Sequence, residues 1–290
     1  MKKSLYIGIL SLFILLSYSC NSEDSELNIT PSPNDPSTIV AVTSLDVSYG
    51  SDEDQKYDLY LPQNRTLNTK VIVLVHGGSW VGGDKSDMND YVELIQANLP
   101  QYAIVNINYR LADQNNPPFP MQLDDITSII NDLKVRNEEY IISEDYAFIG
   151  TSAGGHLSLL WSYAYDSQGD VNMVASIVGP TNLSDDAYLN STNPAVQAAF
   201  AIFGNELSTQ FLETYSPLHR VTNTAPPTVL FYGGQDPLIP NSQGSSLSDR
   251  LTQLAVSHEF TFYPEEGHGW DGQNAIDTWN KLSAFVEEHH

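Results

Sequence analysis

The sequence predicts an α/β domain with a mostly parallel, doubly wound central sheet, flanked by helices and without a large lid domain. Residues 71–75 (Val-Ile-Val-Leu-Val) form an unbroken apolar run, as expected of a strand buried on both faces, and the mainly apolar residues 103–109 are expected to form a second strand. After them, apolar residues recur at helical spacing. Strands that alternate with helices favour a parallel sheet, and no internal repeat indicates another architecture.

The elements follow one another in a regular order. Residues 45–49 and 56–62 are expected to be short strands, and the polar stretch 50–55 between them predicts a hairpin at the sheet edge. The further strands are expected at 71–75, 103–109, 146–149, 173–178, 228–232 and 259–263. Helices are expected around the apolar positions of 123–133, 157–161, 247–254 and 276–285.

A nucleophile elbow is the strongest motif. Gly150-Thr-Ser-Ala-Gly154 follows the expected strand 146–149 and precedes a helical stretch, which is the context that G-x-S-x-G requires. A side chain at either glycine would crowd the strained turn that exposes the hydroxyl of Ser152. The next N–H, that of Ala153, would face the reacting carbonyl at a helix N-terminus. The alternative is an ordinary turn of small residues between a strand and a helix.

A second loop supplies candidate oxyanion donors. His76-Gly-Gly-Ser-Trp80 directly follows the strand 71–75, and its glycines let backbone N–H groups approach a ligand without interference from a Cβ. The loop resembles the HGGG-type loop of esterases, with Ser79 in the place of the third glycine. We predict that Gly77 and Gly78, together with Ala153, form an oxyanion hole. The alternative is a plain glycine turn between strand and helix.

An acid and a base follow two later strands. Asp236 lies in a Gly/Pro loop after the strand 228–232, and His268 lies between two glycines after the strand 259–263. A carboxylate in such a place can orient and stabilise an imidazolium, and the histidine can swing toward a nucleophile. We therefore predict a catalytic triad of Ser152, Asp236 and His268.

Other residues compete for these roles. The alternative acids are Asp185, Asp186, Glu265 and Glu266, which lie in segments expected to be less rigid than the loop of Asp236. His156 falls in the helix after the elbow and is expected to point away from Ser152, and His76 is expected to be structural. Asp124 and Asp125 are interpreted as a solvated pair on a helix.

From about Leu45 to the C-terminus the chain resembles the α/β-hydrolase superfamily, and within it a small esterase/lipase family that includes bacterial feruloyl and acetylxylan esterases (BD-FAE-like). The stretches that carry the resemblance are Tyr57–Pro62, His76–Trp80, Gly82–Asp84, Asn108–Ala112, Gly150–His156, Ser216-Pro217, Asp236 and Gly267–Gly269. The chain order of the triad is also that of the superfamily. The resemblance implies hydrolysis of carboxylic esters through an acyl-enzyme, without a metal, with acetyl or feruloyl esters of polysaccharides as candidate substrates.

Two other functions stay open. A weaker resemblance to kynurenine formamidases and to the catalytic domains of prolyl-oligopeptidase-like peptidases implies cleavage of amides or peptides on the same triad. A non-catalytic surface binding lipoprotein with a decayed site is the alternative of another class. The intact triad argues against the binding protein, and the resemblance favours an esterase that acts on a small-molecule or polysaccharide-borne ester.

Two features bear on substrate choice. Residues 180–225 mix small and polar residues, so we expect an irregular insertion over the site. The insertion is too short for a large lid domain. We expect it to decide which acyl group the site accepts. The aromatic residues Trp80, Trp270, Tyr109 and Phe119 either line an aryl-acyl pocket or belong to the core. The core is the favoured interpretation.

The first 40 residues do not belong to the predicted fold. Residues 1–19 match a signal peptide, with two lysines before an apolar stretch too short for a comfortable membrane span. Cys20, the only cysteine, resembles a lipoprotein box, so we predict lipidation there and a flexible acidic tether over 20–40. The alternative is a plain secretory signal. We expect export from a bacterial cytoplasm, a lipid anchor as the only membrane contact, a place at the outer-membrane surface, and a catalytic domain over 41–290.

Composition argues against several other classes. The chain of 290 residues has a formal net charge of −24 at pH 7, and such a surface repels the phosphates of nucleic acids. The sequence has no H-E-x-x-H, no cysteine cluster and no dinucleotide fingerprint, so no metal and no cofactor is expected. The pattern indicates no particular oligomeric state.

Overall fold

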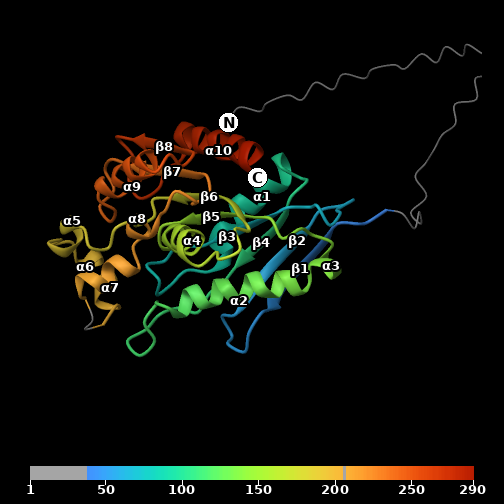
Figure 1. Ribbon diagram of the computed structural model, residues 1–290, viewed down its shortest axis with the longest axis horizontal. Coiled ribbons are helices and arrows are strands. Elements are labelled where there is room, and N and C mark those ends of the chain that lie inside the picture. Colours follow the sequence, from blue (N-terminus) through green and yellow to red (C-terminus); the bar gives the residue numbers. More distant parts are fainter. Residues whose placement is uncertain (1–37, 205–206) are drawn as a thin grey trace, which may run out of the picture. The chain divides into compact units, whose positions relative to one another are not determined.

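An eight-stranded sheet runs through the domain and contains all the predicted strands (Figure 1). The computed structural model describes residues 38–204 and 207–290, so the predicted signal peptide, Cys20 and most of the tether lie outside the described residues. The strands are β1 (Val42–Ser48), β2 (Lys56–Leu61), β3 (Val71–Val75), β4 (Ala103–Ile107), β5 (Tyr146–Thr151), β6 (Val171–Ile177), β7 (Thr228–Gly233) and β8 (His258–Tyr263).

The strand order is β1-β2-β4-β3-β5-β6-β7-β8. β2 pairs antiparallel with both β1 and β4, whereas every later pair in this order is parallel. The predicted edge hairpin and the mostly parallel sheet are therefore confirmed. Val75 lies opposite Gly150, and Gly233 opposite Tyr263, so the loops that leave β3, β5, β7 and β8 all start from one edge of the sheet.

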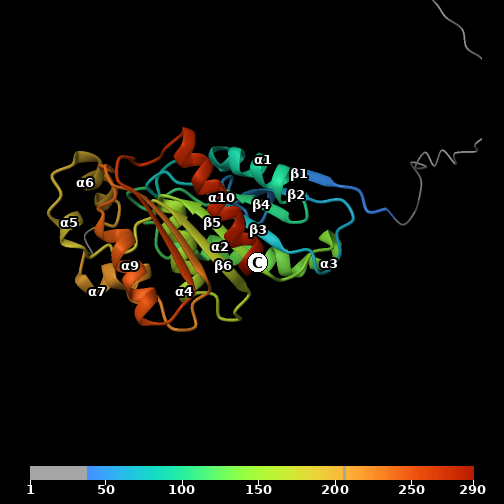
Figure 2. The ribbon, with the colours of Figure 1, turned by 90° about the horizontal axis from the view of Figure 1, so that it is seen from above.

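Helices cover both faces of the sheet. They are η1 (Lys85–Met88), α1 (Asn89–Asn98), α2 (Met121–Val135), α3 (Asn137–Tyr140), α4 (Ala153–Ala164), α5 (Asp186–Leu189), α6 (Pro194–Ala201), α7 (Thr209–Thr214), α8 (Pro217–Arg220), α9 (Ser242–Gln253) and α10 (Gly272–His289). α1 and α10 lie on one face, and α2 and α4 on the other (Figures 1 and 2). Among the described residues, no helix has the length and apolarity needed to cross a membrane.

The core lies between these layers. All five residues of β3 and all five of β4 are buried, because helices cover them from both sides. Helix α4 is buried along most of its length and packs on β5 and β6, which fixes the segment that carries the elbow. Burying such apolar side chains stabilises a fold by roughly 1.5–3 kcal/mol each, before the entropy cost of ordering the chain.

The prediction that 180–225 is irregular was wrong, because four short helices, α5 to α8, lie there. The side chains of Asp185, Asn193 and Ser208 each accept a hydrogen bond from an N–H in the first turn of α5, α6 and α7. Such caps satisfy amide groups that would otherwise lack a partner, and Pro194 is preset for the first helical position. Figure 2 shows α5, α6 and α7 gathered beyond one end of the sheet.

Candidate active site

Ser152 lies in the turn between β5 and α4, as the elbow motif predicts. Its backbone has φ 51° and ψ −120°, a conformation that costs a non-glycine residue free energy and that the surrounding packing must hold. A Cβ at Gly154 would lie 2.1 Å from the carbonyl oxygen of Val75, and a Cβ at Gly150 would lie 2.3 Å from that of Gly154. Glycine is therefore the only residue type that allows this close approach of backbone to backbone at the two positions.

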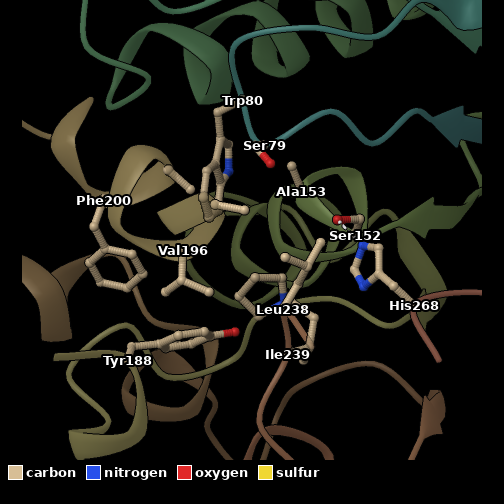
Figure 3. A pocket seen from close by; sticks show the side chains of 13 residues that line it. Ser79, Trp80, Ser152, Ala153, Tyr188, Val196, Phe200, Leu238, Ile239 and His268 are labelled. Atoms are coloured by element: carbon tan, nitrogen blue, oxygen red, sulfur yellow. Dashed lines mark hydrogen bonds between the residues drawn. The ribbon is translucent and has the colours of Figure 1, made fainter. Parts of the chain in front are cut away.

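The structure brings the three predicted triad residues together. Nε2 of His268 lies 2.9 Å from Oγ of Ser152, and Nδ1 lies 2.7 Å from Oδ2 of Asp236. Because a carboxylate only accepts hydrogen bonds, Nδ1 carries the proton, and Nε2 is left to accept the hydroxyl proton of Ser152. Figure 3 shows the imidazole of His268 against the hydroxyl of Ser152 at one side of a pocket.

The carboxylate of Asp236 is held from its other side. Its side chain is 1% exposed, and Oδ1 accepts hydrogen bonds from the N–H groups of Leu238 (2.8 Å) and Ile239 (3.0 Å). These bonds fix the orientation of the carboxylate and leave Oδ2 free for the imidazole. The alternative acid Asp185 has other partners. Its carboxylate accepts a hydrogen bond from the hydroxyl of Ser242 and caps the N-terminus of α5.

The loop 76–80 passes beside Ser152. A Cβ on Gly77 would lie 3.2 Å from Cβ of Ser152, and Gly78 has a φ of 115°, which favours glycine strongly. Ser79 and Trp80 also have positive φ, at 51° and 65°. Three successive residues in this region turn the chain back on itself, so that the carbonyl oxygen of Gly78 accepts hydrogen bonds from the N–H groups of Val81 and Gly82. Gly77 thus lies beside Ser152, and Gly78 is the next residue of the same loop.

Three contacts hold this loop in place. The hydroxyl of Tyr109 donates to the carbonyl oxygen of His76 at 2.9 Å, and Nε2 of Gln122 donates to that of Trp80 at 2.7 Å. The imidazole of His76 stacks on the ring of Tyr109, with centroids 4.3 Å apart. His76 is buried, and its Nδ1 lies 2.6 Å from the carbonyl oxygen of Gly77, in keeping with the structural role expected of it.

Ala153 is the first residue of α4, so its N–H has no acceptor within the helix. The positive end of this 12-residue helix is directed at the turn that holds Ser152. A developing negative charge beside Ser152 would therefore meet a favourable potential as well as an N–H donor.

Two recesses meet at Ser152 and His268. The first, here called the small cavity, has a volume of about 60 Å³ and apolar walls. Its side chains include Trp80, Tyr188, Val196, Phe200, Leu238 and Ile239 (Figure 3). The second, here called the groove, has a volume of about 590 Å³. Its side chains include Asp87, Asp90, Tyr91, Trp270, Thr278 and Trp279.

Several of these lining residues were not predicted from the sequence. Ser79 lines both recesses, and its place as the third residue of a glycine loop was the signal that pointed to it. Tyr188, Val196 and Phe200 come from α5 and α6 and line the small cavity, so the segment 180–225 does lie over the site as expected. Individual residues there could not be named from a segment interpreted as irregular.

The four aromatic candidates divide between core and site. Tyr109 and Phe119 are buried in the core, which was the favoured interpretation. Trp80 is 3% exposed, yet its side chain forms part of the wall of the small cavity. Trp270 is partly buried and lines the groove.

The interpretation of Asp125 as solvated was wrong. Its side chain is fully buried, and its Oδ1 lies 2.6 Å from Nη2 of Arg110. Asp125 also accepts a hydrogen bond from Gln55, and α2 presents it to these partners from its buried face. Asp124 is exposed, as expected.

His156 points away from Ser152, as expected. Its Nε2 lies 2.7 Å from the carbonyl oxygen of Tyr215, and Nε1 of Trp80 donates to its Nδ1 at 3.3 Å. The proton is therefore on Nε2, and the ring is neutral. Complete burial lowers the pKa of His156 from its ordinary value near 6.5 to about 4.

This shift predicts acid sensitivity of the fold. Between about pH 6.5 and pH 4 the unfolded chain binds a proton at His156 that the folded protein does not, so the free energy of unfolding falls as pH falls. His156 alone should remove up to about 3 kcal/mol over this window. Chemical denaturation at several pH values measures the slope.

The variant His156→Gln should flatten that slope, and His219→Gln, at an exposed position, should leave it unchanged. Some slope should persist in His156→Gln, because burial also lowers the pKa of His76 and that of His290. An unchanged slope in His156→Gln would contradict the prediction.

The hydroxyl of Tyr188 is buried and has no hydrogen-bond partner within 38–204 and 207–290. A buried polar group without a partner costs free energy, so Tyr188→Phe should not destabilise the protein and should raise its stability by up to about 1 kcal/mol. In a chain of this size that corresponds to roughly 2–4 °C in Tm. A thermal melt checks it, and a clear drop in Tm would show that the hydroxyl is hydrogen-bonded.

The fold and the site define the class of protein. A mostly parallel sheet, a serine in a strained strand-to-helix turn, and an acid and a histidine after later strands make an α/β-hydrolase. Residues 57–251 match the BD-FAE family, so the chain belongs to that family. In the described part of the chain, no group of three or more His, Cys, Asp or Glu is placed to hold a metal ion.

Individual proteins resemble the chain over most of its length. Esterase LipC of Mycobacterium tuberculosis (strain ATCC 25618 / H37Rv) is 28% identical over 84% of this chain and 64% of its own length. The kynurenine formamidase of Salmo salar is 25% identical over 86% of this chain and 74% of its own length. A truncated form of a carbohydrate esterase from gut microbiota superposes with a TM-score of 0.69 at 20% identity, over 87% of this chain and 98% of that one. The chain spans less than two thirds of the first curated relatives that it matches.

Proposed function

We propose that the protein is a carboxylic ester hydrolase that works through an acyl-enzyme on Ser152. One observation carries the proposal: Ser152, His268 and Asp236 form an unbroken chain of hydrogen bonds where two recesses meet. Membership in the BD-FAE family and the likeness to Esterase LipC support it.

Acylation follows from the positions of the protons. Oγ of Ser152 attacks the ester carbonyl carbon, and its proton passes to Nε2 of His268 across the 2.9 Å contact. Asp236 stabilises the imidazolium through the 2.7 Å contact at Nδ1. The imidazolium then gives its proton to the leaving alkoxide, so the alcohol departs and the acyl group stays on Ser152.

Deacylation repeats these steps with water. Neutral His268 takes a proton from a water molecule, and the resulting hydroxide attacks the acyl carbon. Collapse of the second tetrahedral intermediate expels Oγ of Ser152, which regains its proton from His268. The acid product leaves, and the triad returns to its starting state.

We assign the oxyanion hole to the N–H of Ala153 and to the backbone of Gly77 and Gly78. Ala153 begins α4, and a Cβ on Gly77 would touch Ser152, so both backbones lie beside the reacting atoms. Losing one such donor typically costs about 10²–10³ in kcat.

Turnover of p-nitrophenyl acetate tests the proposal. The wild-type protein should hydrolyse it, Ser152→Ala should not, and a fluorophosphonate probe should label only the wild type. An inert wild type, or an equally active Ser152→Ala, would contradict the assignment. Absence of labelling would instead favour the non-catalytic surface binding protein.

We infer that the alcohol part of the substrate is a hydroxylated ring, such as a sugar of an acylated polysaccharide. The groove presents the rings of Tyr91, Trp270 and Trp279 for stacking, and Asp87 and Asp90 as acceptors for hydroxyl groups. The likeness to a carbohydrate esterase agrees with this inference. Release of acetate from acetylated xylan, compared with hydrolysis of ethyl acetate, tests it, because the two substrates share the acyl group and differ in the alcohol; a preference for ethyl acetate would contradict it.

A second candidate function is hydrolysis of an amide on the same triad. The similarity to a kynurenine formamidase over 86% of this chain favours it. Relative kcat/KM on N-formylkynurenine and on p-nitrophenyl acetate decides between the two, because an amidase would prefer the former. Prolyl amides test the peptidase alternative in the same assay.

We also propose that the protein is exported and anchored by a lipid on Cys20, with the outer-membrane surface as its location. The proposal rests on the signal-like residues 1–19 and on the single cysteine that follows them. Metabolic labelling with palmitate should mark the wild type but not Cys20→Ser. A labelled Cys20→Ser variant, or a wild type found only in the medium, would contradict it.

A further inference from the structure

The two recesses at Ser152 differ greatly in size and lining. The small cavity measures about 60 Å³ and is bounded by apolar side chains, whereas the groove measures about 590 Å³ and carries two carboxylates. An ester hydrolase must place an acyl group on one side of the reacting carbon and an alcohol on the other. The assignment of these two groups to the two recesses decides the substrate class.

The position of His268 makes the assignment. In acylation the leaving oxygen takes its proton from Nε2 of His268, so the alcohol must lie on the histidine side of Ser152. The groove is lined by Gly269 and Trp270, which directly follow His268, and by residues of α10. The small cavity extends to the other side, past Ala153 toward α5 and α6, as Figure 3 shows.

We propose that the small cavity binds the acyl group and admits only short aliphatic acyl groups, of roughly two to four carbons. This inference rests on the ester hydrolysis proposed above and goes beyond it by choosing between acetyl-type and feruloyl-type substrates. An apolar cavity that holds a benzene ring has a volume of about 150 Å³, more than twice the volume available here. The aromatic ring of a feruloyl group therefore does not fit.

The far wall of the small cavity is held by packing between aromatic rings. Val196 is 6% exposed, and Phe200 packs on Tyr188 with ring centroids 5.1 Å apart and on Phe203 at 5.4 Å. Phe203 in turn packs on Trp80, with ring centroids 5.3 Å apart. Because closely packed interiors yield little, a longer acyl chain meets a wall instead of displacing it. Phe200 and Val196 are thus the residues that limit acyl length.

A series of p-nitrophenyl esters with one leaving group tests the limit. We expect kcat/KM to be similar for acetate, propionate and butyrate, to fall at least about tenfold for hexanoate, and to fall further for ferulate. A profile that stays flat to hexanoate, or in which ferulate is the best substrate, would overturn the acyl assignment while leaving ester hydrolysis intact. No Ser152-dependent turnover of any ester would overturn the proposed function and, with it, this inference.

Two variants move the limit in opposite directions. Phe200→Ala should raise the ratio of kcat/KM for hexanoate to that for acetate at least about tenfold. Ala199→Leu, at a cavity-lining position, should lower the ratio for butyrate to that for acetate by a similar factor. The Ala199→Leu variant keeps the test decisive if Phe200→Ala fails to fold.

The matched control is Phe260→Ala. Phe260 is a half-buried phenylalanine of β8 that packs on Tyr232 and lines neither recess. Its ratios should equal those of the wild type. Unchanged ratios in both Phe200→Ala and Ala199→Leu, or the same change in Phe260→Ala, would overturn the assignment of the cavity wall.

Discussion

Asp236→Asn should lower kcat for ester hydrolysis by about 10⁴-fold, with little change in the fold. Oδ1 of Asp236 accepts hydrogen bonds from two backbone N–H groups, so the amide of the variant must keep its oxygen there. Its amino group then takes the place of Oδ2 and donates to Nδ1 of His268. The proton of the neutral imidazole is forced onto Nε2, where it can no longer accept the hydroxyl proton of Ser152. Steady-state kinetics with p-nitrophenyl acetate measure the loss.

Glu266→Gln is the matched control. Glu266 is one of the alternative acids, and its carboxylate accepts a hydrogen bond from Asn274 without reaching the histidine. The control should keep the kcat of the wild type, and both variants should melt as the wild type does. If Asp236→Asn were as active as Glu266→Gln, Asp236 would have no part in the mechanism.

The buried strands and the triad could be predicted from the sequence because both depend on local patterns. A run such as 71–75 has no polar residue, which only a strand covered on both faces tolerates. Each triad residue lies in the loop that follows a strand, and parallel strands place their carboxyl ends at one edge of the sheet. Sequence order and topology alone therefore bring Ser152, Asp236 and His268 together.

Helix α1 was not predicted because its signal is weak. Only Val92 and Ile95 of its ten residues are buried, and Met88 in the N-cap position offers no side-chain oxygen to cap it. The burial of Asp125 escaped prediction for a different reason. Its partner Arg110 is 15 residues away in the sequence, and no local pattern pairs a helical carboxylate with the residue after a distant strand.

The walls of the small cavity depend on long-range packing and could not be read from the residues. Tyr188, Val196 and Phe200 line the same cavity as Ser152 only because α5 and α6 lie beyond the carboxyl ends of the strands (Figure 2). The chemistry thus comes from short motifs on the strands, whereas the proposed acyl specificity comes from a segment with weak periodicity. Exchange of 186–201 between relatives should therefore change acyl preference without changing the triad.

Gly154→Ala should produce the largest loss of stability among single substitutions of the elbow. The added Cβ would lie 2.1 Å from the carbonyl oxygen of Val75 and 2.3 Å from that of His76, both backbone atoms that no side-chain rotation can move. To relieve the overlap, α4 must move away from β3, which disrupts the core and displaces Ser152. We expect a loss of at least about 3 kcal/mol. Thermal melts should show a decrease in Tm of roughly 6 °C or more.

The matched control is Gly267→Ala, next to the candidate base. A Cβ there would meet no atom within 4 Å, and its φ is not positive, so the substitution should leave Tm close to that of the wild type. Both variants add one methyl group to a glycine near the triad, so a difference in their Tm reports the steric overlap at Gly154 and not the chemical change itself. Equal stability of the two variants would show that α4 and β3 are less closely packed than the elbow requires. Loss of Ser152 labelling by a fluorophosphonate in Gly154→Ala alone would show that the same contact holds the nucleophile in position.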